Sequence, residues 1–317
     1  MTGGLGFLGS NFIDYVLKEH NDWQIINVDK ETYASNRAYL SQYNNDSRYE
    51  LITGDISIKS QIEEHLKDVD IIVNFAAESH VDNSIKGSKA FIMSNYVGVK
   101  NLLEIATERG IRIHQVSTDE VFGSLPLNSK QKFNEKTRYD PRNPYSATKA
   151  AADHLAMAFL NTFGTKVTIS YSGNNYGPHQ HPEKLIPKTI LNLALGKKIP
   201  LYGTGFQIRD WVYVEDHCRA IDLILNKGKI GDKFIISSGN LMKNLDMVLK
   251  ITLLMRKSKD MIEFVRDRPG HDLKYASSAI YIKKSLGWYP RVNLQNGLIK
   301  TIEHYNNNLN WYLGMIV

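Results

Sequence analysis

Short apolar runs alternate with longer amphipathic segments along the first half of the chain, and this alternation restricts the possible folds most. Runs rich in β-branched residues predict strands at residues 24–28, 49–53, 71–75, 112–117 and 166–170. Helical periodicity fills the gaps, at residues 10–19, 60–66, 97–109 and 147–163. Strands that alternate with helices of this length form parallel βαβ units, whose sheet is covered by helices on both faces. The sequence therefore predicts an α/β fold built on a doubly wound parallel sheet.

Proline and glycine become more frequent after Asn174, which indicates a change of architecture there. The residues concerned are Pro178, Pro182, Pro187, Pro200, Gly203 and Gly205. A strand-then-helix pattern at residues 210–226 suggests that the chain returns to the first sheet. We therefore expect a first domain of residues 1–172 plus about 211–240. A smaller α/β substrate-binding lobe would comprise about 173–210 plus 241–317.

Composition excludes several classes of protein. Apolar residues make up 42% of the 317 residues and charged residues 23%, which is enough to build a core and argues against a disordered chain. The single cysteine, Cys218, excludes a disulfide scaffold. The apolar stretches are shorter than the roughly 18 to 20 residues of a bilayer span, and Met1 does not open a signal segment. A cytoplasmic protein without membrane contact is expected.

Neither a nucleic acid nor a metal ion is expected as a partner. The formal charge of +6 comes from 39 basic and 33 acidic residues that are interspersed along the chain, which suits a small phosphorylated substrate better than a nucleic acid. The ten histidines lack the paired short spacings of zinc ligands, apart from His179 and His181. Because that pair lies in a proline-bounded loop, we interpret it as a turn that faces solvent or substrate.

Three glycines near the start of the chain form a G-x-x-G-x-x-G pattern that runs into the first expected helix. Gly3, Gly6 and Gly9 would let a pyrophosphate approach the backbone, because no Cβ atoms stand in the way. A glycine-rich turn without a ligand is the alternative for this pattern alone. About twenty residues later, Asp29 follows an expected strand, where a carboxylate binds the ribose hydroxyls of a dinucleotide. The combination predicts a Rossmann-type domain that binds NAD, and the neighbouring Lys30 leaves NADP as the alternative.

The strand that normally precedes such glycines is short in this sequence. Only Met1 and Thr2 stand before Gly3, whereas a dinucleotide-binding domain carries a full strand there. We expect that residues before Met1 are missing from the sequence. A naturally truncated strand, which would weaken both the sheet and the binding of NAD, is the alternative.

Two further motifs carry groups suited to proton transfer. Tyr145 and Lys149 lie four residues apart at the start of an expected helix, hence on one face. A neighbouring ammonium lowers the pKa of a phenol toward the working range of a base. Asp119 and Glu120 follow Thr118 at the end of an expected strand, where parallel sheets bind ligands and where two carboxylates can take opposite acid and base roles. For the tyrosine–lysine pair the alternative is an ordinary helix. For the two carboxylates it is a solvated acidic turn.

These motifs resemble the extended short-chain dehydrogenase/reductases, and within them the dTDP-glucose 4,6-dehydratases of deoxysugar biosynthesis. The resemblance runs nearly end to end, and the Thr-Asp-Glu triplet distinguishes dehydratases from simple 4-epimerases. Its stretches are residues 32–34, 54–56, 76–82, 118–123, 174–178, 182–187, 209–211 and 267–271. Phe122 departs from the pattern by replacing a tyrosine, which removes one hydroxyl hydrogen bond. Residues 171–173, Tyr-Ser-Gly, also depart from it and alter the strand edge near the nicotinamide.

The resemblance implies a three-stage reaction that starts and ends with the same form of the cofactor. Tyr145, assisted by Thr118 and Lys149, would remove the proton of the C4 hydroxyl while hydride passes from C4 to NAD. Glu120 would then take the C5 proton as Asp119 protonates the departing C6 hydroxyl, and water would be lost. Return of the hydride to C6 would give dTDP-4-keto-6-deoxyglucose, in deoxysugar biosynthesis of the rhamnose type.

The resemblance also implies binding residues and an assembly. The residues implied for NAD are Gly3, Gly6, Phe7, Leu8, Gly9, Asp29, Lys30, Glu31, Thr32, Asp55, Ile56, Phe75, Ala76, Ala77, Ser79, Ser94, Tyr145, Lys149 and Asn175. Those implied for the nucleotide sugar are Ser79, Thr118, Asn174, Lys184, Leu185, Pro200, Leu201, Tyr202, Arg209, Asn244, Asp267, Arg268, Pro269, Gly270 and His271. Arg209 and Arg268 are expected to clamp the diphosphate, because a guanidinium offers paired donors to phosphate oxygens. A homodimer is implied, packed through residues 97–109 and 147–163.

Two alternative functions stay open from the sequence alone. Another nucleotide-sugar dehydratase or a 4-epimerase, acting on a UDP-, CDP- or GDP-sugar, would share most of these motifs. A non-catalytic NAD-binding protein would be consistent with the short first strand. The intact set of proton-transfer groups argues against that reading; it comprises Thr118, Asp119, Glu120, Tyr145 and Lys149.

Overall fold

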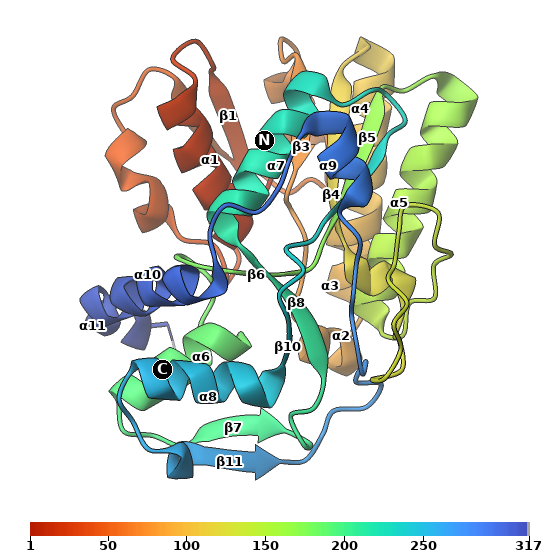
Figure 1. Cartoon of the computed structure of the whole chain (residues 1–317). Helices are drawn as coiled ribbons and strands as arrows, with labels where there is room; N and C mark the ends of the chain where they lie inside the picture. Colours follow the sequence, from red (N-terminus) through yellow and green to blue (C-terminus); the bar gives the residue numbers. More distant parts are fainter. Residues whose placement is uncertain (316–317) are drawn as a thin grey trace.

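A computed structural model describes residues 1–315 and confirms the expected α/β fold with parallel strands (Figure 1). The larger half holds a four-stranded parallel sheet in the order β3-β4-β5-β9 and a parallel pair, β1-β2. The bounds are β1 Ile25–Asp29, β2 Tyr49–Thr53, β3 Ile71–Asn74, β4 Arg112–Thr118, β5 Val167–Ser172 and β9 Lys233–Ile236. Thr2 lies between β1 and β3 and forms bridges to Val28 and Asn74. The first residues of the chain thereby join the two sheets into one layer.

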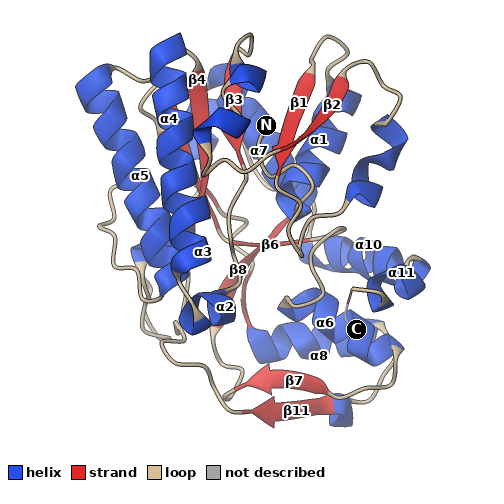
Figure 2. Ribbon diagram, turned by 180° about the vertical axis from the view of Figure 1, so that it is seen from behind, coloured by secondary structure: helices blue, strands red, loops and turns tan. Residues whose placement is uncertain are grey.

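Helices cover both faces of this layer, so strands β1, β3, β4, β5 and β9 are mostly buried, whereas the edge strand β2 is only partly covered. Figures 1 and 2 show α1 and α7 on one face and α4 and α5 on the other. The bounds of the helices in this half are α1 Phe7–Glu19, α2 Val81–Lys86, α3 Lys89–Ile92, α4 Gly98–Arg109, α5 Pro144–Phe163, α7 Val214–Lys227 and α9 Ile280–Leu286. A π-helical turn, η4 Met93–Val97, joins α3 to α4, and 3-10 turns are η1 Arg37–Tyr43 and η5 Asp119–Phe122.

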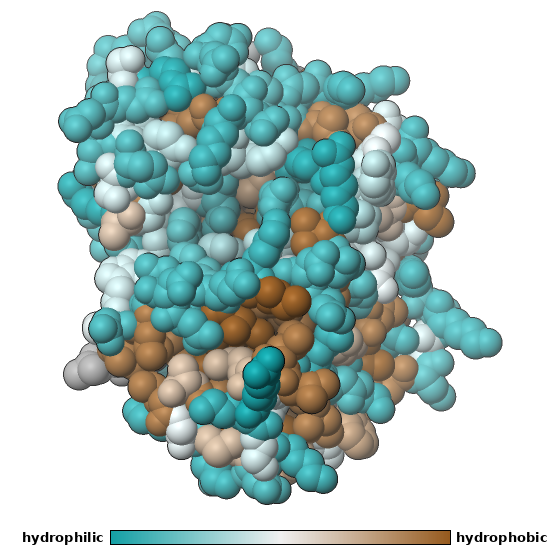
Figure 3. All heavy atoms as spheres, turned by 60° about the vertical axis from the view of Figure 1, so that its left-hand side comes forward, coloured by the Kyte–Doolittle hydropathy of each residue, from teal (hydrophilic) through white to brown (hydrophobic). Residues whose placement is uncertain are grey.

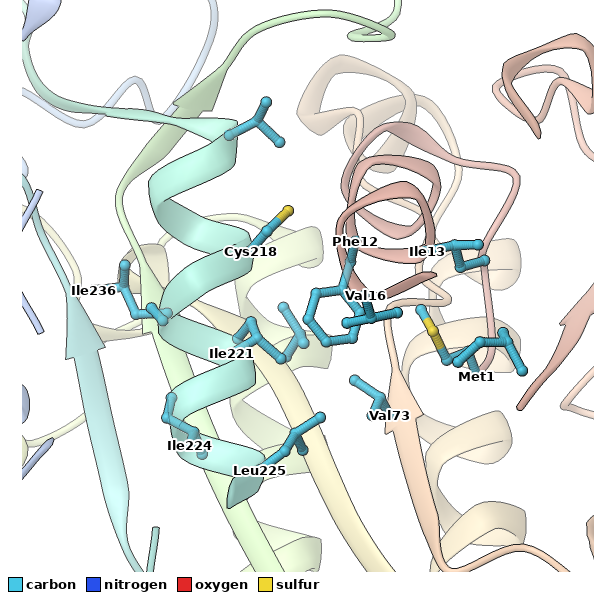
Figure 4. Packing of buried hydrophobic residues seen from close by; sticks show 14 of the residues in the cluster. Met1, Phe12, Ile13, Val16, Val73, Cys218, Ile221, Ile224, Leu225 and Ile236 are labelled. Carbon is cyan, nitrogen blue, oxygen red and sulfur yellow. The ribbon is translucent and has the colours of Figure 1, made fainter. Parts of the chain in front are cut away.

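Helices α1 and α7 pack against each other through fully buried apolar side chains. Figure 4 shows Phe12 and Val16 of α1 facing Ile221 of α7, with Val73 of β3 close by. Burial of each such side chain stabilises the fold by roughly 1.5 to 3 kcal/mol. Cys218 lies in the same cluster as a buried free thiol. This packing fixes α1, whose first turn faces the glycine loop.

Up to residue 315, the smaller half contains two short sheets and four further helices. Strand β8 pairs with β6 in parallel and with β10 antiparallel, while β7 and β11 form a separate parallel pair. The bounds are β6 Asn174–Tyr176, β7 Ile199–Tyr202, β8 Ile208–Tyr213, β10 Leu241–Lys243, β11 Ile262–Val265, α6 Leu185–Ala194, α8 Asn244–Leu254, α10 Leu294–Asn307, α11 Leu309–Leu313 and the 3-10 turn η6 Lys259–Met261. Figure 3 shows apolar atoms gathered on the lower part of one face, over this half, and a mainly hydrophilic upper part.

Two expectations about the elements are wrong. Residues 60–66 form no α-helix but two 3-10 turns, η2 Lys59–Gln61 and η3 Glu64–Leu66, with Ile62 between them at φ −124°. The backbone at Ile62 departs from helical angles and separates the two turns, although Ile62 and Leu66 are buried as the periodicity requires. The strand after residue 207 does not rejoin the first sheet, since β8 pairs with β6 and β10. Helix α7 and strand β9 make that return instead.

Candidate active site

A crevice lies at the carboxyl ends of β1 and β3, beside the glycine turn. Its lining is Gly3, Gly6, Val28, Asp29, Lys30, Thr32, Ala34, Ser35, Gly54, Ile56, Phe75, Ala76, Ala77, Glu78 and Ser94. Most of the residues implied for the adenosine and pyrophosphate parts of NAD are therefore brought together here. Phe7, Leu8 and Gly9 form the first turn of α1, directly after Gly6. A ligand at the carboxyl edge of the strands is the usual arrangement in parallel α/β sheets.

The glycine turn is shaped for an anion. Gly3 has φ +71°, and a Cβ atom there would lie 2.6 Å from the backbone of Ala76. Helix α1 begins after Gly6 without a side-chain cap, and its first turn holds no acidic residue. The N–H groups and the positive end of the helix dipole are thus left for a ligand, which suits a pyrophosphate.

Asp29 organises the rim of the crevice. One carboxylate oxygen accepts from the Leu5 amide at 2.9 Å, and the other accepts from the Glu31 amide and the Ser35 hydroxyl, each at 2.8 Å. The side chain is nearly buried, at 5% exposed. Asp29 therefore ties the glycine turn to the loop after β1 and holds a negative charge at the crevice.

The Lys30 ammonium already contacts a hydroxyl and two carboxylates. Its Nζ donates to Ser94 Oγ at 2.7 Å and lies 3.9 Å from Asp55 and 3.7 Å from Glu78. An ammonium between two carboxylates gains little from an additional phosphate, and a 2′-phosphate next to Asp29 and these carboxylates would be repelled. The site accordingly favours NAD over NADP.

Several residues implied for NAD lie outside the crevice lining. Glu31 pairs with Arg37 at 2.6 Å, and this hydrogen bond lowers the pKa of the Glu31 carboxyl to about 2. Asp55 accepts from the Ser57 amide at 2.8 Å. Asn175 donates to Ser172 Oγ at 2.8 Å. These side chains are bound to neighbouring residues in the structure.

Tyr145 and Lys149 lie on consecutive turns of α5 and are both buried. The helix starts with a capping box in which the Asn143 side chain accepts from the Ser146 amide. Lys149 Nζ donates to the Val116 carbonyl at 2.6 Å, and burial lowers the pKa of Lys149 to about 8. Burial raises the pKa of Tyr145, and a hydrogen bond from Thr118 acts in the opposite direction. The phenol therefore depends on nearby positive charge to act as a base.

Asp119 and Glu120 follow β4 but differ in environment. Asp119 is 2% exposed, and no donor within residues 1–315 reaches its Oδ2. Burial, followed by the charges of Glu120 and Asp210, raises the pKa of Asp119 well above its usual value. Glu120 Oε2 lies 3.4 Å from the Tyr275 hydroxyl and 3.5 Å from Asn143 Nδ2. One carboxyl is therefore held as an acid next to a second that lines an open cavity.

This second cavity lies between the two halves of the chain. Its lining is Ser79, His80, Val81, Asp82, Glu120, Asn174, Gln180, Glu183, Lys184, Leu185, Ile186, Lys188, Pro200, Leu201, Tyr202, Arg209, Trp211, Asn244, Arg268 and His271. Most residues implied for the nucleotide sugar meet here although they come from distant segments. Thr118, Asp267, Pro269 and Gly270 do not line it. Gly270 lines a neighbouring cavity, and Asp267 accepts from His271 Nδ1 at 2.6 Å.

The cations of this cavity are held by oriented partners. Arg268 lies 3.6 Å from Asp82, which also accepts from the Tyr202 hydroxyl at 3.0 Å. The guanidinium of Arg209 donates to two backbone carbonyls and lies 4.2 Å from the centre of the Tyr275 ring. Lys184 Nζ donates to the Ser79 carbonyl at 3.0 Å. Fixed positive charge in a cavity suits a diphosphate.

Comparison with known proteins agrees with this geometry. The family described as GDP-mannose 4,6 dehydratase matches residues 1–301. The dTDP-glucose 4,6-dehydratase of Mycobacterium tuberculosis (strain ATCC 25618 / H37Rv) is 40% identical over 313 residues, which cover 98% of this chain and 94% of that protein. The chain belongs to this family of 4,6-dehydratases.

Two further comparisons cover nearly the whole chain. A dTDP-glucose 4,6-dehydratase from Streptomyces venezuelae, solved with NAD bound, is 39% identical and superposes with a TM-score of 0.96, covering 99% of this chain and 98% of that one. A low-salt glycan biosynthesis protein of Haloferax volcanii is 44% identical over 306 residues, which cover 96% of this chain and 97% of that protein. The extended short-chain dehydrogenase/reductase resemblance is thereby confirmed.

The departures from the 4,6-dehydratase pattern are accommodated by packing. Phe122 is buried against Tyr139 and Tyr171, whose hydroxyls contact each other at 2.5 Å. At Gly173, a Cβ atom would lie 2.8 Å from the carbonyl oxygen of Asp210, so a larger residue requires a shift of that strand. Neither departure displaces a proton-transfer group.

The expected turn at residues 179–181 is only partly correct. His179 packs into the protein, because its ring stacks on Tyr39 at 4.1 Å and its Nδ1 contacts Ser10 Oγ at 3.1 Å. His181 lies 3.6 Å from Glu183, at the rim of the second cavity. Within residues 1–315, no three histidine, cysteine, aspartate or glutamate side chains are placed to hold a metal ion, and no helix is long and apolar enough to cross a membrane.

Reasoning from the sequence missed residues that touch the site. Asn143 and Tyr275 contact Glu120. Asn143 carries a local signal, since an asparagine before Pro144 marks a helix start. Tyr275 carries none, because the chain brings it to Glu120 across 155 residues.

Proposed function

We propose that this protein converts dTDP-glucose to dTDP-4-keto-6-deoxyglucose by removing water, as an NAD-dependent hydro-lyase. The observation that carries the proposal is the pair of adjacent carboxyls, one buried with a raised pKa and one facing the cavity, beside the Tyr145–Lys149 pair. A 4-epimerase needs no such pair, since it expels no water. The names of the relatives in Mycobacterium tuberculosis and Streptomyces venezuelae support dTDP-glucose as the substrate.

The crevice fits NAD in shape and charge. Close approach to Gly3 and Gly6, the open start of α1 and the carboxylate of Asp29 match a pyrophosphate and an adenosine ribose. Bound NAD supplies the oxidant for C4 and, once reduced, the reductant for C6. Residues 1–172 plus about 211–240 would form this NAD-binding domain, and about 173–210 plus 241–317 the nucleotide-sugar lobe.

Tyr145 acts on the C4 hydroxyl. Its phenol takes the hydroxyl proton, and the Thr118 hydroxyl orients it. Lys149 stabilises the phenolate through its positive charge, and its bond to the Val116 carbonyl holds the ammonium in place. This first step makes C4 a ketone and the C5 hydrogen acidic.

Asp119 and Glu120 then divide the loss of water between them. Asp119, whose pKa is raised by burial, donates a proton to the leaving C6 hydroxyl. Glu120, which lines the cavity, takes the C5 proton. Arg209, Arg268 and Lys184 bind the diphosphate, and the two arginines keep their orientation through Asp82 and backbone carbonyls.

The protein would work as a cytoplasmic homodimer that packs through α4 and α5. Exposed apolar side chains support the dimer, including Phe163 at the end of α5, which is 61% exposed, and Ile92 of α3, which is 46% exposed. The single buried cysteine is consistent with a reducing compartment.

Incubation with nucleotide sugars tests the proposal. The purified protein, with NAD and without added reductant, is mixed with dTDP-glucose, UDP-glucose or GDP-mannose, and products are followed by mass spectrometry. Loss of one water from dTDP-glucose alone is expected. Loss from another sugar nucleotide would change the assigned substrate, and an unchanged mass in every reaction would contradict the dehydratase assignment.

A further inference from the structure

Glu120 is linked to a second buried carboxylate by a single tyrosine. The Tyr275 hydroxyl lies 3.4 Å from Glu120 Oε2 and 2.5 Å from Asp272 Oδ2. Tyr275 is 1% exposed and Asp272 3% exposed. A phenol between two carboxylates, shielded from solvent, is a short hydrogen-bonded chain rather than a chance surface contact.

The tyrosine has one proton to donate, and the distances assign it to Asp272. The shorter contact is typical of a charge-assisted O–H···O⁻ bond. The Tyr275 oxygen then keeps a lone pair that faces Glu120. A carboxylate cannot donate to that lone pair, but a protonated Glu120 can. The arrangement therefore suits Glu120 in the state it reaches after it has taken a proton.

The chain Glu120–Tyr275–Asp272 leads out of the substrate cavity. Asp272 lines a separate open cavity of about 310 Å³, together with Ser124, Leu125, Pro126, Arg142, Gly270, His271 and Leu273. Glu120 belongs to the lining of the substrate cavity, and Asp272 does not. The Tyr275 hydroxyl thus links a carboxylate of one cavity to a carboxylate of the other, and His271 lines both cavities.

The ring of Tyr275 is fixed in place. The guanidinium of Arg209 lies 4.2 Å from its centre and donates to the Asp272 carbonyl at 2.9 Å. The Tyr275 amide donates to the Ile208 carbonyl at 3.0 Å. A ring held from the backbone and from one face keeps its hydroxyl between the two carboxylates.

We propose that Tyr275 and Asp272 form a proton relay that connects Glu120 with solvent outside the substrate cavity. Glu120 passes the proton taken from C5 to the Tyr275 oxygen as the Tyr275 hydroxyl proton moves to Asp272, and Asp272 releases it to water. The reverse sequence brings a solvent proton back to C5. No charge is created or lost in either direction, and Tyr275 is neutral before and after each transfer. The relay rests on the proposed role of Glu120.

The deuterium content at C5 of the product measures whether the C5 proton is exchanged with solvent, as the relay requires. The reaction of dTDP-glucose is run in D₂O to low conversion, quenched with borohydride to prevent later exchange, and examined by mass spectrometry. Wild-type protein is expected to place deuterium at C5 in most product molecules. Tyr275→Phe is expected to return the original hydrogen in most molecules, with turnover slowed about tenfold by loss of the hydrogen bond to Glu120.

Two further variants separate the relay from a structural effect. Asp272→Asn keeps the phenol and a hydrogen-bond acceptor but cannot take up the proton, so the same loss of C5 deuterium is expected even where Tyr275→Phe is unstable. Tyr139→Phe removes another partly buried hydroxyl, one that contacts Tyr171, and should leave the C5 deuterium at the wild-type level.

Three outcomes would overturn the relay. Retention of the original C5 hydrogen by the wild-type protein would show that Glu120 does not exchange with solvent. Wild-type deuterium content in both relay variants would show that exchange takes another route. A wild-type protein that forms no dehydrated product would overturn the proposed function together with the relay, which distinguishes that failure from the other two.

Discussion

The NAD crevice and the substrate cavity are built in different ways. The crevice depends on backbone: a glycine at φ +71°, an uncapped helix start and one carboxylate that binds two amides. The cavity depends on charged side chains from loops, helices and strand β8 between residues 79 and 271. A crevice made from one local motif can be recognised in the sequence, whereas a cavity assembled from distant segments becomes visible only in the fold.

The two sites should therefore respond differently to substitution. A substitution in the crevice changes backbone geometry, so both the stability of the fold and the affinity for NAD should fall. Damage to the cavity removes single charges or proton-transfer groups, and the fold and bound NAD should persist.

Glu120→Gln has the largest expected effect. The amide cannot accept the C5 proton, so turnover should fall by roughly a thousandfold. Oxidation at C4 uses Tyr145 and should continue, so reduced nicotinamide accumulates and is detected by its absorbance. Tyr145→Phe serves as the matched comparison, since it should block the reaction before any reduced nicotinamide forms. Normal product formation by Glu120→Gln would refute the role assigned to Glu120.

Gly3→Ala is expected to damage the crevice. The added Cβ would lie 2.6 Å from the Ala76 backbone at a positive φ, so the free energy of unfolding should fall by roughly 2 to 4 kcal/mol. NAD affinity should fall with it, as measured by calorimetry. Gly87→Ala is the control, because a Cβ there has no neighbour within 4 Å among the described residues. Equal stability of the two variants would contradict the tight approach inferred at Gly3.

Arg268→Ala should affect the substrate cavity alone. Loss of one guanidinium is expected to raise the KM for dTDP-glucose about tenfold. NAD affinity and the melting temperature should not change, since Arg268 lines only the cavity. Arg138→Ala, which alters net charge equally but lies outside both linings, is the control. A parallel loss of NAD affinity in Arg268→Ala would show that the two sites are not independent.

Asp153→Asn should change how stability depends on pH, with the smallest effect on activity. Burial raises the pKa of Asp153 from 3.8 to about 7, so between these values the folded protein holds a proton that the unfolded chain has lost. The free energy of unfolding should therefore fall as pH rises through this window, by up to roughly 1.4 kcal/mol per pH unit from this residue.

Urea denaturation at several pH values measures that slope. The asparagine keeps the hydrogen bond with Ser117 but does not titrate, so the difference between wild type and variant should vary from pH 4 to pH 7. Two parallel profiles would mean that Asp153 is ionised in the folded protein throughout.

The sequence predicts the fold well where the pattern is local. Residues 49–53 form a strand as predicted, and the G-x-x-G-x-x-G turn leads into α1. Residues 60–66 fail as a helix because a short amphipathic segment packs its apolar side chains equally well from 3-10 turns. The strand at 208–213 was expected in the wrong sheet, because periodicity identifies a strand and not its partner.

The residues of the candidate site show the same difference between local motifs and contacts that form only in the fold. Asp29 and the glycines were found from spacing, since a local motif fixes their positions relative to one another. Tyr275 and Asp272 could not be found, because their contact with Glu120 exists only after β8 has aligned the segment around residue 274. Resemblance to a family implies Glu31 and Asn175 at the cofactor, and this stays a prediction; in the structure their side chains contact Arg37 and Ser172.

The path of one hydrogen tests the central claim most directly. The claim is that the chain oxidises C4 and reduces C6 of the same sugar while water leaves. A mixture of dTDP-glucose deuterated at C4 and unlabelled dTDP-glucose carrying a ¹³C label is incubated with the NAD-loaded protein, and the products are separated by mass. Deuterium at C6 of ¹²C product only is the predicted result. Deuterium that remains at C4, or that appears in ¹³C product, would contradict the account.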